Sequence, residues 1–401
     1  MGAPLPMTSD AQPLEMAVDS IFGFIQRTAE PAEVGRCWVT IDYENKPQRD
    51  PSVFNGVGGI SFFLVDFFRR SGRREALALA QDAIDWCVAF RGQHHLRGLH
   101  LGKTGVALAA LHKSIALDEA TVPESCLENA QVILREPPGP VTDLLGGEAS
   151  NGLYLLKLWA RTRDDTHLRG AERCAAWIES KITRDALGTH CLVDPDNRLG
   201  GFPARIYLGA AHGISGVAHF LACLAEATRA ERWAGLAREL FETVMRYAQP
   251  IHGGLNWSPC IDNPELSRCQ WSHGAPGIGL TLLTAHRVLG DVRYLESAVA
   301  AAEATYHYGD FRQNYTQCTG LAGGGELLLE VFRATGDARW KQRAGEFALQ
   351  CLRYRESTPD GDAWPTDAPG LYSADFENGA SGVGHFLLRV LDDGATPLPL
   401  M

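Results

Sequence analysis

Five segments of the chain share one pattern of glycine and apolar positions. Each has Gly-x-x-Gly, then Ile or Val, and then a continuous apolar run. The five are NGVGGISFFL (55–64), LGKTGVALAAL (101–111), HGISGVAHFL (212–221), HGAPGIGLTLL (273–283) and NGASGVGHFLL (378–388). Composition alone would produce roughly one such match in a chain of this length. Five matches therefore indicate an internal repeat.

Two weaker copies fill the gaps between these segments. GGEASNGLYLL (146–156) has Ser150 at the second glycine, and TGLAGGGELLL (319–329) has Gly324 where the others carry Ile or Val. The leading glycine then occurs seven times, at Gly56, Gly102, Gly147, Gly213, Gly274, Gly320 and Gly379. The sequence therefore predicts seven repeats.

Each repeat predicts two helices. The glycines allow a tight turn and a close backbone approach, and the apolar run after them is too continuous for a surface helix. An amphipathic segment follows, for example RREALALAQDAIDWCVAF (73–90), with apolar residues at helical spacing. Such a pair cannot bury its apolar surface alone, so neighbouring pairs must stack.

Seven stacked pairs predict an all-α fold, a single (α/α)7 toroid or barrel with seven inner and seven outer helices. We expect one domain over residues 1–401, with a flexible N-terminal lead of about residues 1–15. The one strand candidate is GTHCLVD (188–194), as a short hairpin arm. Closure of the ring brings seven helix N-termini, with their free N–H groups and positive dipole ends, to one mouth. We expect the active site there, although packing alone would explain most of the glycine pairs.

Composition and charge exclude several classes of protein. The net charge of −11 argues against nucleic-acid binding, and no apolar run approaches the roughly 18 residues of a membrane span. LGKTG (101–105) is not a phosphate loop, because the spacing from Gly98 is one residue short and no strand precedes it. The N-terminus lacks a secretory signal, and the ten cysteines form no CxxC pair, as expected of buried thiols in a reducing compartment. We predict a cytoplasmic protein with no nucleic-acid or membrane partner.

The repeats resemble a known family. Together with YLGAAHGISG (207–216), WSHGAPG (271–277) and the CTG at 318–320, they are similar to the lanthionine synthetase C-like cyclases from about residue 50 to 392. The resemblance implies an α/α toroid and a Michael addition, in which a peptide Cys thiol adds to dehydroalanine or dehydrobutyrine and closes a thioether ring. The thiol must react as the thiolate, and the enolate must be stabilised and protonated.

The resemblance also implies roles for individual residues. His212 matches the acid–base histidine of the family, and Asp143 matches an aspartate that orients it; a structural histidine and an N-cap of the third inner helix are the alternatives. Arg268, four residues before Ser272, would hold the enolate oxygen or a peptide carbonyl, unless it forms a surface salt bridge. His273 is a second candidate base or fills a polar niche.

The metal site of the family is incomplete in this chain. Zinc-dependent members use two cysteines and a histidine and leave a fourth position for the substrate thiol. The matching positions hold Ser272, Cys318 and Thr319, and one ligand of three cannot hold catalytic zinc. A rescue set of Cys269, His273 and Cys318 remains open. We expect no cofactor, as in class III cyclase domains and stand-alone class V cyclases, with His212 or His273 as the base.

Three residues of the same motifs, Trp271, Tyr207 and Cys318, are expected to bind substrate. The expected partners are a dehydrated precursor peptide and, since 401 residues leave no room for lyase and kinase domains, separate kinase and lyase proteins. A free-standing cyclase is favoured over an excised domain. One alternative is a catalytically silent module that binds the precursor or assembles the kinase and lyase.

A second alternative is an α/α-barrel carbohydrate enzyme. Such an enzyme needs paired acidic side chains across the mouth. The candidates would be Asp143, Glu148, Glu326 and Asp375.

Overall fold

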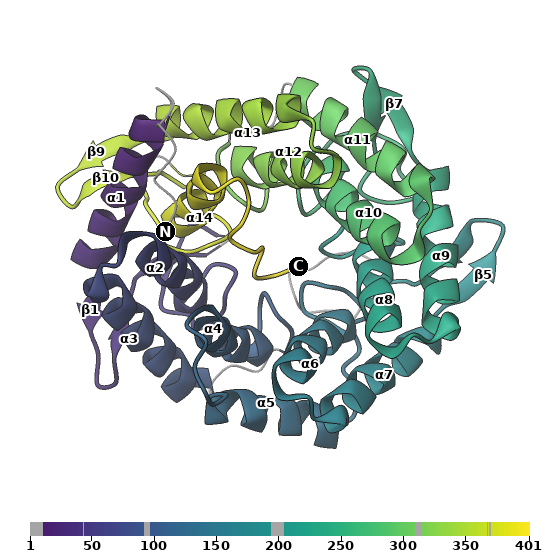
Figure 1. Cartoon of the computed structure of the whole chain (residues 1–401), viewed down its shortest axis with the longest axis horizontal. Coiled ribbons are helices and arrows are strands. Elements are labelled where there is room, and N and C mark those ends of the chain that lie inside the picture. The colour runs from purple at the N-terminus through teal and green to yellow at the C-terminus, as the bar shows by residue number, and fades with distance from the viewer. Residues whose placement is uncertain are drawn as a thin grey trace.

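The computed structural model describes residues 11–42, 44–91, 97–193, 204–308, 314–366, 368 and 370–401. Within these ranges the chain forms fourteen α-helices and five two-stranded antiparallel hairpins. The helices form two concentric rings around a central bore (Figure 1). The predicted all-α toroid is confirmed.

The inner ring contains seven helices. They are α2 (Val57–Ser71), α4 (Lys103–Ala116), α6 (Glu148–Thr162), α8 (Ile214–Thr228), α10 (Ala275–Leu289), α12 (Leu321–Thr335) and α14 (Ala380–Leu391). Each begins immediately after one of the seven leading glycines, which is its N-cap. The predicted turns and inner helices are therefore confirmed in all seven repeats.

The outer ring also contains seven helices. They are α1 (Ala11–Arg27), α3 (Arg74–Phe90), α5 (Glu124–Arg135), α7 (Asp165–Glu179), α9 (Glu231–Arg246), α11 (Val292–His307) and α13 (Ala338–Cys351). Six of them follow their inner helix in the chain, but the outer neighbour of α14 is α1. Residues 11–15 of the expected flexible lead are therefore helical, because α1 buries an apolar stripe from Leu14 to Ile25. Residues 1–10 lie outside the described residues.

The hairpins lie in connections that lead from an outer helix to the next inner helix. They pair β1 (Glu30–Pro31) with β2 (Arg36–Cys37), β3 (Thr40–Ile41) with β4 (Pro47–Gln48), β5 (Thr183–Asp185) with β6 (Gly188–His190), β7 (Gln249–Ile251) with β8 (Gly254–Asn256), and β9 (Glu356–Thr358) with β10 (Gly361–Ala363). A 3-10 turn, Leu352–Tyr354, follows α13. The predicted arm at 188–194 overlaps β6, and its last residue lies outside the described residues. Strands of two or three residues are too short to show an alternating pattern, so the other hairpins were not predicted.

The need for the second glycine of the turn, in the six repeats that carry it, is steric. At Gly277 an added Cβ would lie 1.9 Å from the carbonyl oxygen of Trp271, three residues before the leading glycine. The same clash, at 1.8–2.2 Å, arises in five other repeats, at Gly59, Gly105, Gly216, Gly323 and Gly382. In the third repeat Ser150 uses its hydroxyl instead, accepting from the N–H of Leu99 at 3.2 Å and donating to the carbonyl of Gly147 at 2.7 Å.

Replacing Gly277 by Ala should lower the free energy of unfolding by about 1–3 kcal/mol, because the new methyl group meets rigid backbone. The matched control is Gly345→Ala in α13, where nothing lies within 4 Å of an added Cβ; it should stabilise the protein by about 0.5–1 kcal/mol. Urea unfolding followed by circular dichroism measures both. Equal midpoints for the two variants would contradict the steric explanation.

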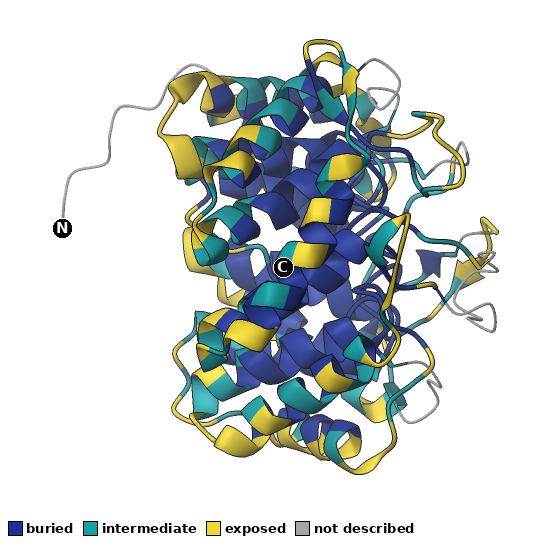
Figure 2. Cartoon of the chain, turned by 90° about the vertical axis from the view of Figure 1, so that its right-hand side faces the viewer, coloured by how far each residue is buried: buried dark blue, intermediate teal, exposed yellow. Residues whose placement is uncertain are grey.

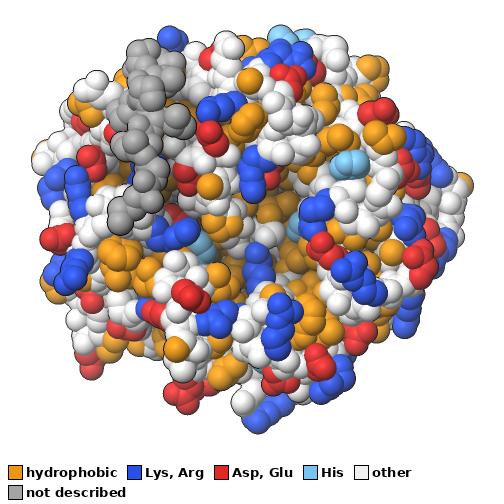
Figure 3. All heavy atoms as spheres, in the orientation of Figure 1, with side chains coloured by type: hydrophobic (Ala, Val, Ile, Leu, Met, Phe, Trp, Pro, Cys, Tyr) orange, Lys and Arg blue, Asp and Glu red, His pale blue; other side chains and the backbone are white. Residues whose placement is uncertain are grey.

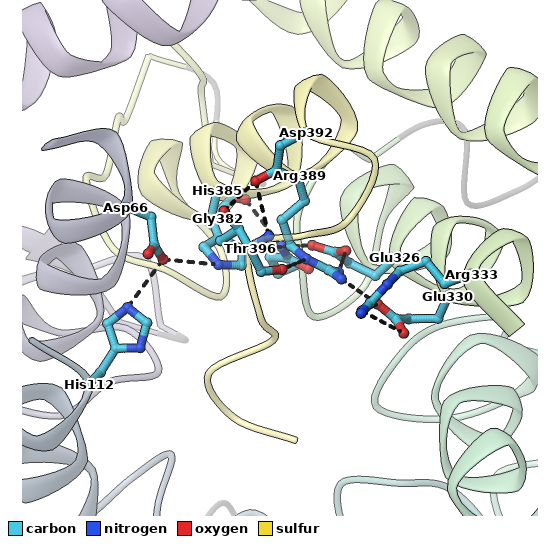
Figure 4. Close-up of polar contacts among 11 residues, drawn as sticks. Asp66, His112, Glu326, Glu330, Arg333, Gly382, His385, Arg389, Asp392 and Thr396 are labelled. Atoms are coloured by element: carbon cyan, nitrogen blue, oxygen red, sulfur yellow. Dashed lines mark hydrogen bonds and ion pairs between the residues drawn. The ribbon is translucent and has the colours of Figure 1, made fainter. Parts of the chain in front are cut away.

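A buried polar network lies inside the bore (Figure 4). Asp66 lies 3.2 Å from His112 and 3.6 Å from His385. Glu326 forms an ion pair with Arg389, whose Nε donates to the carbonyl of Thr396 at 2.7 Å. Burial alone would lower the pKa of His385, but the neighbouring carboxylates of Asp66 and Glu326 raise it. The network ties α2, α4, α12 and α14 together and anchors the segment after α14.

That segment, residues 392–401, turns into the bore and reaches the centre of the ring (Figure 1). Its last residues line a small cavity together with Trp271 and Glu377, and the carbonyl oxygen of Met401 accepts from Lys157 Nζ at 2.7 Å. Buried residues concentrate on the inner helices and the turns before them (Figure 2). Figure 3 shows the other end of the ring, at which the inner helices end, with a hollow at its centre.

Nine of the ten cysteines are buried, as predicted; Cys223 is half-buried. Of the helices in the described ranges, none combines the length and the apolar character needed to span a lipid bilayer.

Candidate active site

The seven glycine turns are joined by a closed cycle of backbone hydrogen bonds. In each turn, the residue two positions before the leading glycine donates its N–H to the carbonyl oxygen of its counterpart in the next turn. We call these seven buried residues the rim ring: Phe54, His100, Leu145, Ala211, Ser272, Cys318 and Glu377, with N···O distances of 2.9–3.4 Å. The cycle closes where Glu377 donates to Phe54 at 3.0 Å.

The rim ring fixes how far apart its side chains lie. Hydrogen-bonded neighbours in extended backbone are about 4.8 Å apart, so a ring of seven is about 11 Å across. Ser272 and Cys318 are neighbours in this ring, because the N–H of Ser272 donates to the carbonyl of Cys318 at 3.3 Å. The two positions that matched metal ligands in the sequence therefore lie side by side.

His212 and Asp143 meet beside the rim ring, although 69 residues separate them in the chain. His212 precedes the leading glycine of the fourth turn, and its Nδ1 lies 2.7 Å from Oδ2 of Asp143. The carboxylate can only accept, so Nδ1 carries the hydrogen of this bond, and Nε2 is the nitrogen that can take up or deliver a second proton. The other oxygen of Asp143 accepts from the N–H of Gly146 at 2.9 Å. Asp143 thus stabilises the turn and orients His212, but it does not cap the helix, whose N-cap is Gly147.

His273 and Tyr207 pack next to this pair. The His273 ring lies 5.9 Å from the His212 ring, and Tyr207 lies 6.3 Å from His212 and 5.7 Å from His273 between centroids. Burial, with the charges of His212 and Arg268, lowers the pKa of His273 to about 3. His273 therefore stays neutral near pH 7. His212 has the carboxylate of Asp143 to stabilise its protonated form.

Arg268 lies at the exposed edge of the same group. Its charge lowers the pKa of His273 and acts in the same direction on Tyr207, so the guanidinium lies near both side chains. Its Nη1 donates to Gln270 Oε1 at 3.4 Å. This partner is a neutral amide, so the contact is not the surface salt bridge considered as the alternative role of Arg268.

Trp271 packs against a different histidine, His100 of the rim ring. Its indole lies 5.1 Å from the His100 ring and lines the small cavity in the bore. The structure therefore brings His212, Asp143, His273, Tyr207 and Arg268 together next to Ser272 and Cys318, and Trp271 packs against His100. The sequence analysis missed His100 and Glu377. Both residues lie two positions before a leading glycine, as Ser272 and Cys318 do, and this shared offset is the sequence signal that could have identified them.

Comparison with known proteins identifies the family. Residues 47–401 match the family described as lanthionine synthetase C-like protein. The chain belongs to the lanthionine synthetase C-like family. The resemblance seen in the sequence is confirmed.

Two curated relatives and one solved structure are similar to this lanthionine synthetase C-like chain. The Danio rerio protein named glutathione S-transferase LANCL1 is 31% identical over 157 residues, a match that spans only 38% of each chain. The Arabidopsis thaliana LanC-like protein GCL1 is 27% identical over 327 residues, covering 77% of this chain and 72% of that protein. The structure of nisin cyclase superposes with a TM-score of 0.67 and 16% identity over 94% of this chain and 93% of its own. At that identity the superposition supports the toroid fold alone.

The donor set of this family member does not fit zinc. The hydroxyl of Thr319 lies 3.0 Å from Thr316 Oγ1 and accepts from Asn314 Nδ2 at 3.0 Å. Cys269, from the rescue set, is buried so deeply that its pKa rises to about 12, and its Sγ lies near Thr305 Oγ1. Among the residues that the structure describes, no three His, Cys, Asp or Glu side chains are placed to hold a metal ion. The rescue set is therefore not assembled, and zinc-independent activity stays a prediction.

The four acidic residues considered for a carbohydrate enzyme are held by other contacts. Asp143 binds His212, and Glu326 pairs with Arg389 inside the bore. Glu148 accepts from the N–H of Gly139 at 2.8 Å. Asp375 accepts from the N–H of Asn378 at 2.8 Å, and burial raises its pKa to about 7. Each of the four carboxyl groups therefore has a partner within the fold, and these contacts mark no two of them as the paired acid and base of glycoside hydrolysis.

Replacing His273 by Gln should make the protein less sensitive to acid. The pKa of this histidine is lowered from 6.5 to about 3 in the folded state, so between these pH values the unfolded chain binds a proton that the folded chain does not. The free energy of unfolding therefore falls as pH drops below about 6.5, and the variant lacks this contribution. Unfolding midpoints measured from pH 7 to pH 4 should fall less in the variant than in the wild type. If the midpoints of the wild type and the variant instead fall in parallel with pH, His273 takes up a proton in the folded state and the prediction is wrong.

Proposed function

We propose that this protein adds a peptide cysteine thiol to dehydroalanine or dehydrobutyrine and so closes lanthionine or methyllanthionine rings without zinc. The observation that carries the proposal is the His212–Asp143 pair, bonded at 2.7 Å beside the Ser272–Cys318 edge of the rim ring. Membership of the lanthionine synthetase C-like family supports this class of reaction.

The proposed chemistry needs two proton transfers and one site for negative charge. The S–H bond breaks and its proton passes to a base at the rim, sulfur bonds to the β-carbon, and the electrons of the C=C bond move to the carbonyl as an enolate. His212, in its imidazolium form and held by Asp143, delivers a proton from Nε2 to the α-carbon. Arg268 and the N–H groups of the inner-helix N-termini stabilise the enolate oxygen. No cofactor enters the proposal.

The proposed substrate is a dehydrated precursor peptide, made by a separate kinase and lyase in the cytoplasm. His212 and Tyr207 are 6% and 5% exposed, so the proposed substrate contacts only the rims of these side chains. Arg268, which is exposed, is the group best placed to meet an arriving peptide.

A second candidate function uses a different thiol. The relative named glutathione S-transferase LANCL1 suggests that glutathione, rather than a cysteine of the same peptide, is the nucleophile. The same rim would serve, because the electrophile and the proton transfers are unchanged. A third possibility, a silent module, would bind the precursor and leave it chemically unaltered.

One incubation separates the three. A dehydrated precursor peptide is mixed with the protein, with and without glutathione, and its free thiols and mass are followed. Ring closure consumes thiols at constant mass, which is the result we expect. An increase by the mass of glutathione would favour the second candidate. Tight binding with unchanged thiols and mass would favour the silent module.

A further inference from the structure

The rim ring contains a second histidine–carboxylate pair. His100 Nδ1 lies 3.1 Å from Glu377 Oε1, and both residues belong to the rim ring. His100 is fully buried and Glu377 is 3% exposed. Nε2 of His100 has no hydrogen-bond partner among the described residues. A buried imidazole with one nitrogen held by a carboxylate and the other unsatisfied costs stability, so it calls for an explanation.

The position of His100 in the ring supplies one. In a ring of seven, the member opposite the edge between the fifth and sixth turns belongs to the second turn. That edge is Ser272–Cys318, and the second turn contributes His100. Because the rim ring is about 11 Å across, a long side chain on one side can contact a side chain on the opposite side. The His100 imidazole, from the second turn, and the Trp271 indole, from the fifth, meet across the ring with their centroids 5.1 Å apart.

We propose that His100, oriented by Glu377, is the general base that takes the proton of the substrate thiol. A base whose far nitrogen is held by a carboxylate is the arrangement that activates Ser and Cys nucleophiles. His100 faces the edge at which zinc-dependent relatives would ionise the thiol by metal coordination, and the donor set there does not fit zinc. The inference rests on the proposed thiol addition and names the residue that begins it.

The proton balance is simple. His100 Nε2 takes the thiol proton as the C–S bond forms, and His212 gives its proton to the α-carbon. After one turnover His100 is protonated and His212 is not, and exchange with water restores both.

The ionisable members of the rim ring are His100, Cys318 and Glu377, and the faces of the His100 ring meet Phe54 and Trp271. The Trp271 indole covers His100, so the arriving thiol has to displace it.

The first test compares sulfur with selenium. A synthetic peptide with one dehydroalanine and one cysteine is compared with the same peptide carrying selenocysteine, which ionises at lower pH without help. We expect His100→Phe to lower the rate of ring closure of the cysteine peptide by roughly 10²- to 10⁴-fold near neutral pH. This decrease in rate should be smaller at higher pH, and it should be far smaller for the selenium peptide. His212→Ala should slow both. Equal losses for the two peptides would overturn the proposal, because a merely structural His100 cannot distinguish them.

A second measurement does not depend on ring formation. The peptide is made with alanine in place of dehydroalanine, and alkylation of its thiol by iodoacetamide is followed against pH in the presence of excess protein. The wild type should lower the pKa of the bound thiol and His100→Phe should not. Where His100→Phe does not fold, Glu377→Gln takes its place, with the same result expected. A wild type that leaves the thiol pKa unchanged overturns the inference. A wild type that lowers the thiol pKa but closes no ring would instead overturn the proposed function, and the inference that His100 is the base would still hold.

Discussion

Replacing Asp143 by Asn should lower the rate of the proposed thioether formation by roughly 10²- to 10⁴-fold, whereas the same change at Asp375 should leave it near the wild-type value. The neutral amide does not stabilise the imidazolium that delivers the proton from Nε2, and it no longer fixes the hydrogen on Nδ1 of His212. The rate is measured as loss of free thiol from the dehydrated precursor. His212→Ala should have an effect of similar size, because both residues act as one unit.

Asp375 is a close control because the two aspartates occupy the same place in their turns. Each lies four residues before a leading glycine, and each accepts from the N–H three residues on, Gly146 at 2.9 Å and Asn378 at 2.8 Å. They differ in the second oxygen, which meets His212 in one turn and Ser373 in the other. Equal losses in the two variants would mean that Asp143 acts only by stabilising its turn.

We expect the double variant Ser272→Cys/Thr319→His to bind about one zinc ion per chain and the wild type to bind none in stoichiometric amount. With Cys318 these side chains would supply two thiolates and an imidazole. The backbone hydrogen bond between Ser272 and Cys318 already places two of the three positions side by side. The measurement is metal content by mass spectrometry after dialysis against a buffer with added zinc.

The single variant Ser272→Cys is the control, because it supplies two thiolates without the imidazole and should retain far less zinc. The histidine at position 319 also has to replace the contacts of Thr319 with Thr316 and Asn314. A folded double variant with no more zinc than the wild type would show that the rim ring does not have the geometry of a metal site.

The fold was largely predictable from the sequence because one local requirement recurs in every repeat. The turn needs glycine where Trp271 O and its counterparts approach within 2.2 Å of an added Cβ, so the spacing marks each inner helix directly. The outer partner of α14 was not predictable in this way. It is α1, from the other end of the chain, and only closure of the ring brings the two together.

The site was predictable in part. The motif around His212 and the position of Asp143 pointed to their pairing, which the structure confirms at 2.7 Å. The low pKa of His273 depends on burial that no local sequence reveals. His100 and Glu377 were not predicted as site residues, because their turns lack the motifs from which the sequence analysis took its candidates. Their common offset from the leading glycine becomes meaningful only once the backbone cycle of the rim ring is known.

The most direct test of thiol addition without a metal uses the wild-type protein after removal of bound metal by a chelator. It is incubated with the dehydrated precursor, and free thiols and peptide mass are recorded over time. We predict that thiols disappear at constant mass and at the same rate with or without added zinc. Thiols that persist throughout, or that are consumed only after zinc is restored, would contradict it.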